Sequence, residues 1–431
     1  MKAALKKIIP KQILSLYHLA WAWLSALYYG FPARKLTIIG VTGTNGKSSV
    51  VWILARILDG GGLKTAALSS IEFQIGDRCF ENTYKMTMPG RGRIQKFLYD
   101  ALKAGCTHAI IEVTSEGILQ HRHKFIDFDV TVFLNLAPEH IERHGGYKNY
   151  REAKSRLFAA LKPGGLAVVN VADKEAPWFL RHTRKGRSLG FRLDSSHMQM
   201  ALPHDGILAI AKNIHVSPHG VRFTFDDQQF RSSLRGTMNI ENILVSAAIA
   251  RALGVPLKDS ANTAEHFSDI PGRLEQIKNT AGIRVVVDYA HTPSALERVY
   301  QSVHNDARRM ICVLGAAGGG RDHWKRPQLG ILAGRYCDIA YVTDEDPYDE
   351  DPADIRSAVL LGVKRGTRAT AKEIPDRKEA ITSAILEAHA GDAVVITGKG
   401  SEPWMILANG KKEPWDDRAI AKDALRARNS T

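Results

Sequence analysis

The sequence predicts an α/β protein of two domains with a short helical segment before them. Short apolar runs alternate with stretches of helical periodicity, which is typical of a parallel sheet with crossover helices. A glycine-rich turn connects the first run to an apolar helix, and the alternation starts again near residue 270. A chain of 431 residues is also too long for a single core of ordinary size.

The expected elements follow one another along the chain. The first domain should hold strands at 35–41, 109–113, 130–134 and 166–170, helices at 50–58 and 240–253, and an antiparallel β-section at 198–234. The second should hold strands at 284–287, 310–314, 339–342 and 393–397. These patterns divide the chain into an N-terminal segment (1–34), a central domain with a parallel sheet (35–269) and a Rossmann-like C-terminal domain (270–431).

Charge and composition limit the classes of partner. Lys and Arg total 59 against 45 Asp and Glu, a net charge of +14, and 44% of residues are hydrophobic. This balance is that of a globular protein and excludes a disordered chain. The positive charge favours an anionic partner, such as a nucleotide, a phosphorylated substrate or a membrane surface. No nucleic-acid recognition motif is present, so we expect no nucleic-acid partner.

The four cysteines, Cys79, Cys106, Cys312 and Cys337, lie far apart and form no C-x-x-C pair. A zinc ribbon and a disulfide framework therefore have no support in the sequence. We expect buried, reduced thiols in a cytoplasmic protein.

An apolar and aromatic stretch at 13–31 follows the lysines Lys2, Lys6, Lys7 and Lys11. No small-residue cleavage site follows it, so we do not interpret it as a signal peptide. Two interpretations stay open: an interfacial helix beside anionic lipid at the inner face of the membrane, and a helix packed on the next domain. A single membrane span is a third option, at the lower limit of spanning length.

A glycine turn between a strand and a helix exposes backbone N–H groups that can hold phosphates. In V-T-G-T-N-G-K-S-S at 41–49, Lys47 would reach the terminal phosphates and the Ser48 hydroxyl would bind Mg²⁺. The strict G-x-x-x-x-G-K-[ST] pattern fails, because Val41 replaces its first glycine. An ordinary glycine turn is the alternative, but the strand before the turn, the helix after it and G-K-S inside it favour phosphate binding, as in a P-loop-type ATPase domain. Its nucleotide-binding residues would be Gly43, Thr44, Asn45, Gly46, Lys47, Ser48 and Ser49.

The motif T-G-T-N-G-K-S-S resembles the ATP loop of the Mur ligases, and later motifs follow in the family's order from about Thr37 to Asp416. D-Y-A-H-T-P at 288–293 is similar to the form in the UDP-N-acetylmuramoyl-tripeptide synthetase branch (the MurE type). The resemblance implies a ligase of peptidoglycan synthesis that uses ATP and Mg²⁺. Such an enzyme phosphorylates a carboxylate of a muramyl-peptide acceptor, and an amino acid then displaces the phosphate. We expect a monomer.

The resemblance assigns three residues to metal sites, together with Ser48. Glu112 ends an apolar run beside the phosphate loop, where a carboxylate can hold Mg²⁺. His140 matches a histidine that binds the family's second metal, although Glu139 stands where the motif usually has Asp. Lys154 matches the lysine that carries CO₂ as a carbamate and positions Mg²⁺ and the γ-phosphate. Without the family, each of the three could be a surface residue.

Asn239 and Asn242, in G-T-M-N-I-E-N at 236–242, open the predicted helix. Their amides both donate and accept, as recognition of an adenine edge or a ribose requires. Capping of the helix is the local alternative, and Asn239 could do both.

The resemblance gives the C-terminal domain a role in closing over ATP. Arg273, Asp288 and His291 would bind the ribose and phosphates. In G-A-A-G-G-G-R-D-H-W-K-R-P at 315–327, Lys325 would stabilise the acyl phosphate. Without the family, this stretch is typical of a flexible basic loop.

Selection of the amino acid is expected in T-D-E-D-P-Y-D-E-D-P at 343–352, around Asp346. In diaminopimelate-adding enzymes the corresponding D-N-P-R motif ends in an arginine for the distal carboxylate, and this chain has Tyr348 there. An acidic surrounding favours a cationic side chain, lysine or ornithine, although a solvated acidic loop is the alternative. In G-K-G-S-E, which starts at Gly398, Glu402 would hold the incoming amine.

On the acceptor side, Thr87, Ser115 and Arg122 lie in segments that resemble the family's contacts with the muramyl substrate. Glu116 stands where that motif has histidine. The ATP loop begins near residue 41, so we expect the family's usual N-terminal UDP-binding domain to be lacking. One hypothesis links this to 13–31: an acceptor at the membrane, held on a lipid.

The sequence leaves two other functions open. A folylpolyglutamate-like or other Mur-family amide ligase shares the ATP loop, but D-Y-A-H-T-P and the acidic loop disfavour it. A non-catalytic nucleotide-binding partner of a cell-wall complex is the alternative from another class. The joint presence of Lys47, Ser48, Glu112, His140 and Lys154 argues against such a loss of activity.

Overall fold

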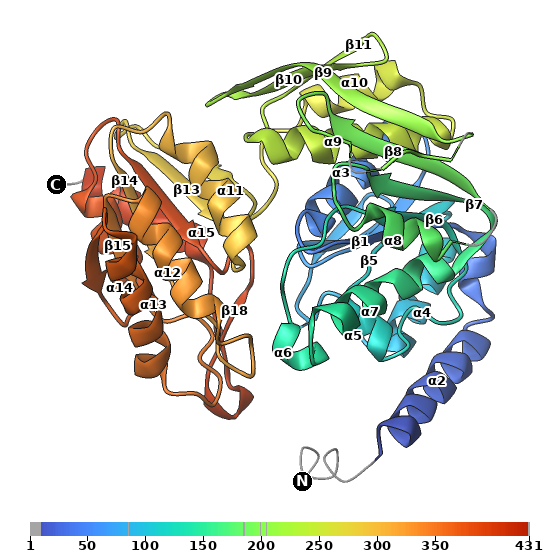
Figure 1. Ribbon diagram of the computed structural model, residues 1–431, viewed down its shortest axis with the longest axis horizontal. Helices are drawn as coiled ribbons and strands as arrows, with labels where there is room; N and C mark the ends of the chain where they lie inside the picture. The colour runs from blue at the N-terminus through green and yellow to red at the C-terminus, as the bar shows by residue number, and fades with distance from the viewer. Residues whose placement is uncertain (1–9, 85, 184–185, 199, 204, 430–431) are drawn as a thin grey trace.

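Two α/β bodies face each other across a cavity, and helix α2 (Lys11–Tyr28) extends from the first of them (Figure 1). The computed structural model describes residues 10–84, 86–183, 186–198, 200–203 and 205–429. Lys2, Lys6 and Lys7, which one interpretation of the sequence places beside anionic lipid, therefore lie outside the described residues. An 11-stranded sheet ends before residue 233 and a 6-stranded sheet begins after residue 274, so the boundary predicted near residue 270 falls between them.

The first sheet has the order β11-β10-β9-β8-β7-β6-β1-β5-β2-β3-β4. The strands from β9 to β2 in this order are parallel, and the two margins are antiparallel. The strands are β1 (Thr37–Thr42), β2 (Thr65–Leu68), β3 (Glu72–Ile75), β4 (Arg78–Glu81), β5 (His108–Glu112), β6 (Phe128–Phe133), β7 (Leu161–Asn170), β8 (Arg187–Leu193), β9 (Ile207–Ser217), β10 (Gly220–Phe225) and β11 (Gln228–Ser232).

Helices cover both faces of this sheet. They are α3 (Lys47–Gly60), α9 (Thr237–Ala252) and α10 (Leu257–Glu265) on one face, and α4 (Arg91–Lys103), α5 (Ser115–Leu119), α7 (Tyr147–Ala159) and α8 (Ala176–Arg181) on the other, with the short η1 (Pro32–Lys35) and α6 (Ile141–His144).

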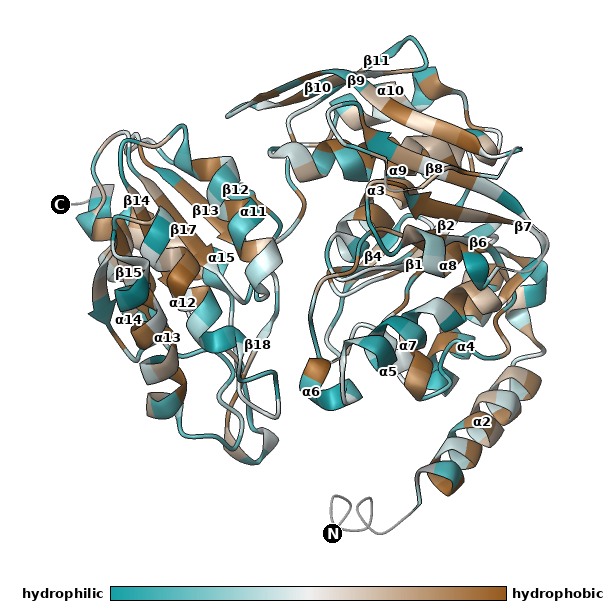
Figure 2. Ribbon diagram, viewed as in Figure 1, coloured by the Kyte–Doolittle hydropathy of each residue, from teal (hydrophilic) through white to brown (hydrophobic). Residues whose placement is uncertain are grey.

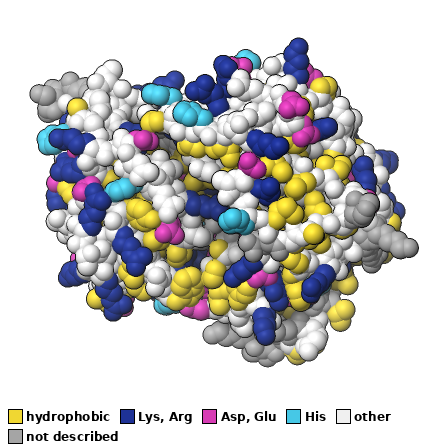
Figure 3. Space-filling view, turned by 45° about the horizontal axis from the view of Figure 1, so that its top comes forward, with side chains coloured by type: hydrophobic (Ala, Val, Ile, Leu, Met, Phe, Trp, Pro, Cys, Tyr) yellow, Lys and Arg dark blue, Asp and Glu magenta, His cyan; other side chains and the backbone are white. Residues whose placement is uncertain are grey.

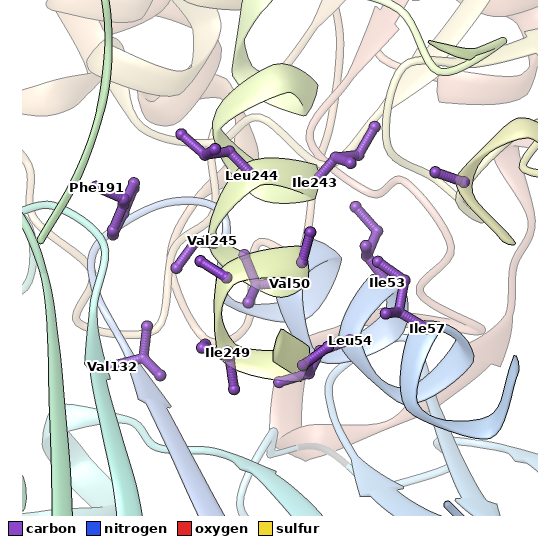
Figure 4. Close-up of a cluster of buried hydrophobic side chains, with 14 of the residues drawn as sticks. Val50, Ile53, Leu54, Ile57, Val132, Phe191, Ile243, Leu244, Val245 and Ile249 are labelled. Carbon is purple, nitrogen blue, oxygen red and sulfur yellow. The ribbon is translucent and has the colours of Figure 1, made fainter. Parts of the chain in front are cut away.

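Apolar periodicity fixes the largest core. Residues Val50, Leu54 and Ile57 recur at helical spacing on α3 and are fully buried. They lie among Val245 and Ile249 of α9 (Figure 4). In Figure 2 the strands inside both bodies carry the apolar colour, so each body has its own core.

The second sheet has the order β12-β13-β17-β14-β15-β16, with only β12 antiparallel. Its strands are β12 (Glu275–Ile277), β13 (Arg284–Asp288), β14 (Met310–Leu314), β15 (Ile339–Val342), β16 (Thr370–Glu373) and β17 (Ala393–Thr397), followed by the hairpin β18 (Trp404–Ile406) and β19 (Lys412–Pro414). Its helices are α11 (Pro293–His304), α12 (Lys325–Tyr336), α13 (Pro352–Gly366), α14 (Arg377–Glu387), η2 (Ala408–Gly410) and α15 (Asp417–Asn429).

The strand order creates a crevice at the carboxyl edge of the first sheet. β1 pairs in parallel with both β5 and β6. The helix after β1, α3, lies on one face and α7, which follows β6, lies on the other. Loops that leave adjacent strands toward opposite faces open a crevice where ligands bind in α/β sheets.

The expectation of reduced cysteines is wrong for one pair. Cys312 of β14 and Cys337, at the end of α12, form a buried disulfide with Cα atoms 6.1 Å apart. The crossover through α12 brings the start of β15 beside β14, a contact that the cysteine spacing alone does not indicate. Cys106 is buried and free, whereas Cys79 is free and exposed.

No helix in the part of the chain that the structure describes is long and apolar enough to cross a membrane, which excludes the single span for these residues. α2 instead packs on α4, with Ala22 and Ala26 buried between them.

Helices α12 and α13 touch backbone to backbone along a seam of four glycines, Gly330, Gly334, Gly362 and Gly366. A Cβ at Gly330 would lie 2.0 Å from the carbonyl oxygen of Val359. The glycine is required by this close approach.

We predict that Gly330→Ala lowers the free energy of unfolding by roughly 3 kcal/mol, because the helices must separate to admit the methyl group. Urea denaturation measures this. Gly92→Ala on α4 is the control, since its Cβ would meet nothing closer than the Ser25 Oγ at 3.4 Å. Equal stability of the two variants would contradict the close-contact argument.

Candidate active site

A cavity of about 530 Å³ lies between the two domains, at the crevice of the first sheet. It is lined by all but three of the residues that the sequence predicts for the site. The three exceptions are Gly43, Lys325 and Gly398, whose close neighbours line it. Lys and Arg side chains outnumber acidic ones on the molecular face in Figure 3, which suits an anionic ligand.

The phosphate loop has the geometry of an anion site. Gly46 adopts φ +85°, and α3 begins at Lys47, so free backbone N–H groups face the cavity. Asn135 supports the loop, because its Oδ1 accepts from the Asn45 N–H at 2.9 Å. The Lys47 ammonium donates to the Thr44 carbonyl at 2.9 Å and lies 3.9 Å from Glu112 Oε1.

Oxygen atoms suited to Mg²⁺ lie beside this loop. The hydroxyls of Ser48 and Ser70 are 2.7 Å apart, and Glu112 Oε2 accepts from the Ser70 N–H at 2.9 Å. Glu112 is buried at the end of β5, which corrects the surface alternative. The described residues contain no group of three or more His, Cys, Asp or Glu that could hold a metal. The oxygens of Ser48 and Glu112 fit an Mg²⁺ ion that takes further ligands from nucleotide phosphates.

Lys154 is buried in the middle of α7 with 2% of its surface exposed, contrary to a solvated position. Its amine donates to the Gly43 carbonyl at 2.6 Å. Burial, followed by the positive charge of Lys47, lowers the pKa of this amine well below its usual range. A neutral amine is nucleophilic and can take up CO₂, so the position suits carbamate formation.

Glu139 links the domains beside His140. Its Oε1 lies 3.1 Å from His291 Nε2, and its Oε2 accepts from the Tyr150 hydroxyl at 3.4 Å. Burial lowers the pKa of His140 to about 4, so its ring is neutral and can donate a lone pair. Glu139 is a residue whose structural importance the motif departure alone did not indicate.

Asn239 and Asn242 line the cavity from α9, but Asn239 is not the helix cap. The N-cap is Gly236, and the Asn239 amide donates to the Arg235 carbonyl at 2.7 Å. Asn242 Nδ2 donates to Asn239 Oδ1 at 3.0 Å, so the two amides are held as a pair.

The buried carboxyl of Asp288 accepts from the backbone N–H groups of Leu274 and Ala290. Burial raises the pKa of Asp288.

The C-terminal domain contributes an arginine that the sequence did not single out. Arg321 lines the cavity, and its guanidinium bonds with Tyr348. Burial opposes its charge, but the neighbouring Tyr289, Tyr348 and Glu402 raise the pKa of Arg321. Its place in G-G-G-R, in a loop already assigned to the phosphates, was the available signal.

Lys399 holds the two acidic residues at this end of the cavity. Its ammonium donates to Asp346 Oδ1 at 2.9 Å and to Glu402 Oε2 at 2.7 Å. Glu402 Oε1 accepts from the Tyr289 hydroxyl at 3.0 Å. Gly398 leaves room for Glu345, since a Cβ there would lie 2.0 Å from Glu345 Oε2.

The sequence predicts an acidic loop that is free to bind a cationic side chain. In the structure, several of its carboxylates are instead bound by the protein. Asp344 pairs with Arg356, and Glu350 pairs with Arg326. Asp351 caps α13 by accepting from the Ala353 N–H at 2.8 Å. Together with Asp346, which pairs with Lys399, three of the loop's six carboxylates are neutralised by basic side chains of the protein itself.

At the acceptor end, Thr87, Ser115 and Arg122 line the cavity. Ser115 Oγ lies 3.1 Å from His144 Nε2, and Arg122 donates to the Met88 carbonyl. Glu116 pairs with Arg143 at 2.8 Å, so the residue that departs from the family motif takes part in an ion pair.

The basic loop before α12 is packed against the central domain. Asp322 accepts from the backbone N–H groups of Ile141 and Glu142, and Lys325 donates to the His291 carbonyl at 3.2 Å. Asp322 and Lys325 are buried, which corrects the flexible-loop alternative.

Comparisons with known proteins agree with this geometry. Residues 41–250 match the Mur ligase middle domain, and residues 272–400 match the Mur ligase glutamate ligase domain. The chain is 33% identical to a UDP-N-acetylmuramyl-tripeptide synthetase of Roseiflexus sp. (strain RS-1), covering 94% of this chain and 82% of that protein. It is 35% identical to a UDP-N-acetylmuramoyl-L-alanyl-D-glutamate--2,6-diaminopimelate ligase of Trichormus variabilis, covering 95% and 81%.

The chain belongs to the Mur ligase family, whose members are ATP-dependent ligases that join an acid to an amino acid and use Mg²⁺. This confirms the predicted class of enzyme. The solved structure of a UDP-N-acetylmuramoyl-L-alanyl-D-glutamate--2,6-diaminopimelate ligase is 29% identical and covers 92% of this chain and 79% of that chain, with a TM-score of 0.59. A Mycobacterium tuberculosis folylpolyglutamate synthase, 16% identical with a TM-score of 0.67 over 88% and 92% of the two chains, shares the fold.

We predict that Lys399→Met lowers the free energy of unfolding by about 3 kcal/mol, because two carboxylates lose the cation between them. Urea denaturation measures the effect. In the control Lys411→Met, an exposed pair with Glu413 is lost, and the expected cost is below about 1 kcal/mol. A Lys399→Met protein as stable as the control would contradict the role assigned to Lys399.

Proposed function

We propose that this Mur-family ligase uses ATP to activate a carboxylate of a muramyl-dipeptide-type acceptor and joins lysine or ornithine to it, in the synthesis of peptidoglycan precursors. One observation carries the proposal. A single cavity brings the phosphate loop, the buried Lys154 and Glu112, and the Arg321–Glu402 end of the other domain together.

The residues around the loop would stabilise charge during phosphoryl transfer. Lys47 and the backbone N–H groups of 43–49 would bind the phosphates of ATP, with Asn239 and Asn242 on the nucleoside and Arg273, Asp288 and His291 closing from the other domain. Mg²⁺ held by Ser48 and Glu112, with a second site at His140 and carbamylated Lys154, would supply positive charge to the phosphate oxygens.

Attack of the acceptor carboxylate on the γ-phosphorus would give an acyl phosphate and ADP. The amine of the amino acid would then attack the acyl carbon, lose a proton and expel phosphate. Thr87, Ser115 and Arg122 would hold the acceptor, and Glu402 would hold the amine. Lys325, which donates to the His291 carbonyl, would stabilise the acyl phosphate. Contacts across the domains, such as Asn45 Nδ2 to Ser294 Oγ at 2.9 Å, support exclusion of water by closure about a boundary near residue 270.

Lysine or ornithine is proposed on the ground of Tyr348, since half of the carboxylates of the acidic loop are already paired with basic residues. Tyr348 stands where the diaminopimelate-adding enzymes have an arginine, and Arg321 beside it would hold the α-carboxylate of any amino acid. Gly398 and Asp346 shape the same end of the cavity through Glu345 and Lys399.

We propose also that the enzyme works as a monomer in the cytoplasm, and that residues 13–31 make a peripheral contact with the inner face of the membrane. The acceptor would be UDP-linked or lipid-linked. The exposure of apolar side chains on α2 supports the proposed membrane contact.

We predict ATP-dependent phosphate release with UDP-N-acetylmuramoyl-dipeptide and lysine or ornithine. Release that depends on both acceptor and amino acid would support the ligase. A preference for diaminopimelate would refute the argument from Tyr348. ATP binding without release for any pair would refute the UDP-linked acceptor and require the assay to be repeated with a lipid-linked one.

We predict that Arg321→Met raises the KM for the amino acid at least about tenfold and leaves the KM for ATP unchanged, because a charge-assisted contact is lost. Steady-state phosphate release measures both constants. Arg335→Met, an exposed position on α12, is the control. An unchanged KM for the amino acid would remove Arg321 from this subsite.

We predict that Lys154→Ala lowers kcat at least about a thousandfold and that short-chain carboxylic acids restore part of the activity, because they replace the carbamate oxygens. Lys148→Ala, on the exposed side of the same helix, should keep full activity. Loss of activity without rescue in a folded protein would count against the carbamate.

A further inference from the structure

Helix α2 has its small and polar residues toward the protein and its large apolar residues toward solvent. Ala22 and Ala26 are buried, and Ser15 and His18 face the body. The opposite side is exposed over the whole length of the helix. Its exposed large side chains are Ile13, Leu16, Tyr17, Trp21, Trp23, Leu24, Leu27 and Tyr28.

This surface is unusual for the molecule. Of the 18 exposed large hydrophobic side chains in the described residues, eight lie on α2. Leu16 is 66% exposed and Tyr28 is 82% exposed. Contiguous apolar surface of this kind marks an interaction site, whereas scattered apolar residues need no explanation. Figure 1 shows α2 standing out from the central domain, where a partner has access to it.

The orientation of α2 is held by specific contacts of its inner side. Ser15 Oγ lies 2.7 Å from His121 Nε2, and Arg91 Nη2 lies 2.7 Å from His18 Nδ1. The Tyr29 ring, just after the helix, packs on Tyr99 of α4 with centroids 5.6 Å apart. A rotation that buried the apolar side would break these contacts, so the apolar face is fixed outward.

The segment that carries this face has charge of one sign, and an acidic side chain from elsewhere in the chain, Asp127, lies 3.9 Å from Arg34. Residues 1–35 contain six basic residues and no acidic one, and the first acidic residue of the chain is Asp59. Arg34 and Lys35 are exposed at the carboxyl end of the helix. Apolar side chains that include two Trp and two Tyr, next to a group of cations, match the interface of an anionic bilayer.

We propose that the exposed face of α2 inserts into the surface of an anionic membrane, with the helix lying along the interface and the basic residues on the lipid headgroups. The proposal deepens the membrane contact given under the proposed function and does not depend on the ligase reaction. A second copy of the chain is disfavoured as the occupant, since each copy of residues 1–35 has six basic residues and no acidic one, and two such segments would repel each other.

The test is flotation of the full chain with vesicles. The wild type should bind phosphatidylcholine vesicles that contain phosphatidylglycerol, bind pure phosphatidylcholine much less, and lose binding as salt is raised. Leu16→Gln/Leu24→Gln/Leu27→Gln should lower the partition coefficient at least about tenfold. The matched control is Leu361→Gln/Leu386→Gln, which changes two leucines exposed on α13 and α14 and should bind like the wild type.

The triple variant keeps Trp21 and Trp23 as reporters. In the wild type, brominated lipids should quench part of the tryptophan fluorescence, and in the Trp21→Phe/Trp23→Phe variant the binding should persist while this quenching is lost.

Circular dichroism checks the fold of each variant, and phosphate release without vesicles should match the wild type. Failure of binding with intact ligase activity would overturn the membrane proposal alone.

Two further results would also overturn the proposal. One is equal binding of the wild type and the triple variant to anionic vesicles. The other is a wild-type dimer in sedimentation velocity that becomes a monomer in the triple variant, together with no vesicle binding, which would assign the face to a second copy of the chain.

Discussion

Parallel pairing of β1 with both β5 and β6 is the constraint on which the active site depends. It places the phosphate loop and Glu112 at one edge of the sheet and sends the following helices to opposite faces. The crevice between them receives Lys154 from α7 and the asparagine pair from α9. The second domain supplies its residues in the same way, because Asp288 ends β13 and Gly398 follows β17.

Buried charges in this crevice are balanced locally. Lys399 lies between Asp346 and Glu402, and Glu139 lies between His291 and Tyr150. Lys154 donates to the Gly43 carbonyl and has no ion pair with any residue that the structure describes. A buried charge without a partner is costly, and the chain lowers that cost for Lys154 by favouring the neutral amine. Carbamate formation, as proposed above for Lys154, requires such a neutral amine.

The sequence could predict those parts of the protein that depend on local pattern. The strands β14, β15 and β17 fall at the predicted residues, since buried parallel strands are continuous apolar runs. The pattern does not reveal the short strands β3 and β4 at the edge, because β3 is only partly buried, β4 is exposed, and neither carries such a run. Arg321 and the Cys312–Cys337 bond depend on contacts between distant segments, and the pairing of the acidic loop with Arg356 and Arg326 does too. Such contacts leave no mark in spacing.

The glycine seam has a consequence for how the second domain can change. α12 begins at Lys325 and α13 begins directly after the acidic loop, so the seam couples the position of that lysine to the position of the loop. With the two backbones in contact, the helices cannot come closer together, and a side chain added at the seam would push them apart together with the loop before α13. Such a change would therefore reach the cavity through the acidic loop, although none of the four glycines of the seam lines the cavity.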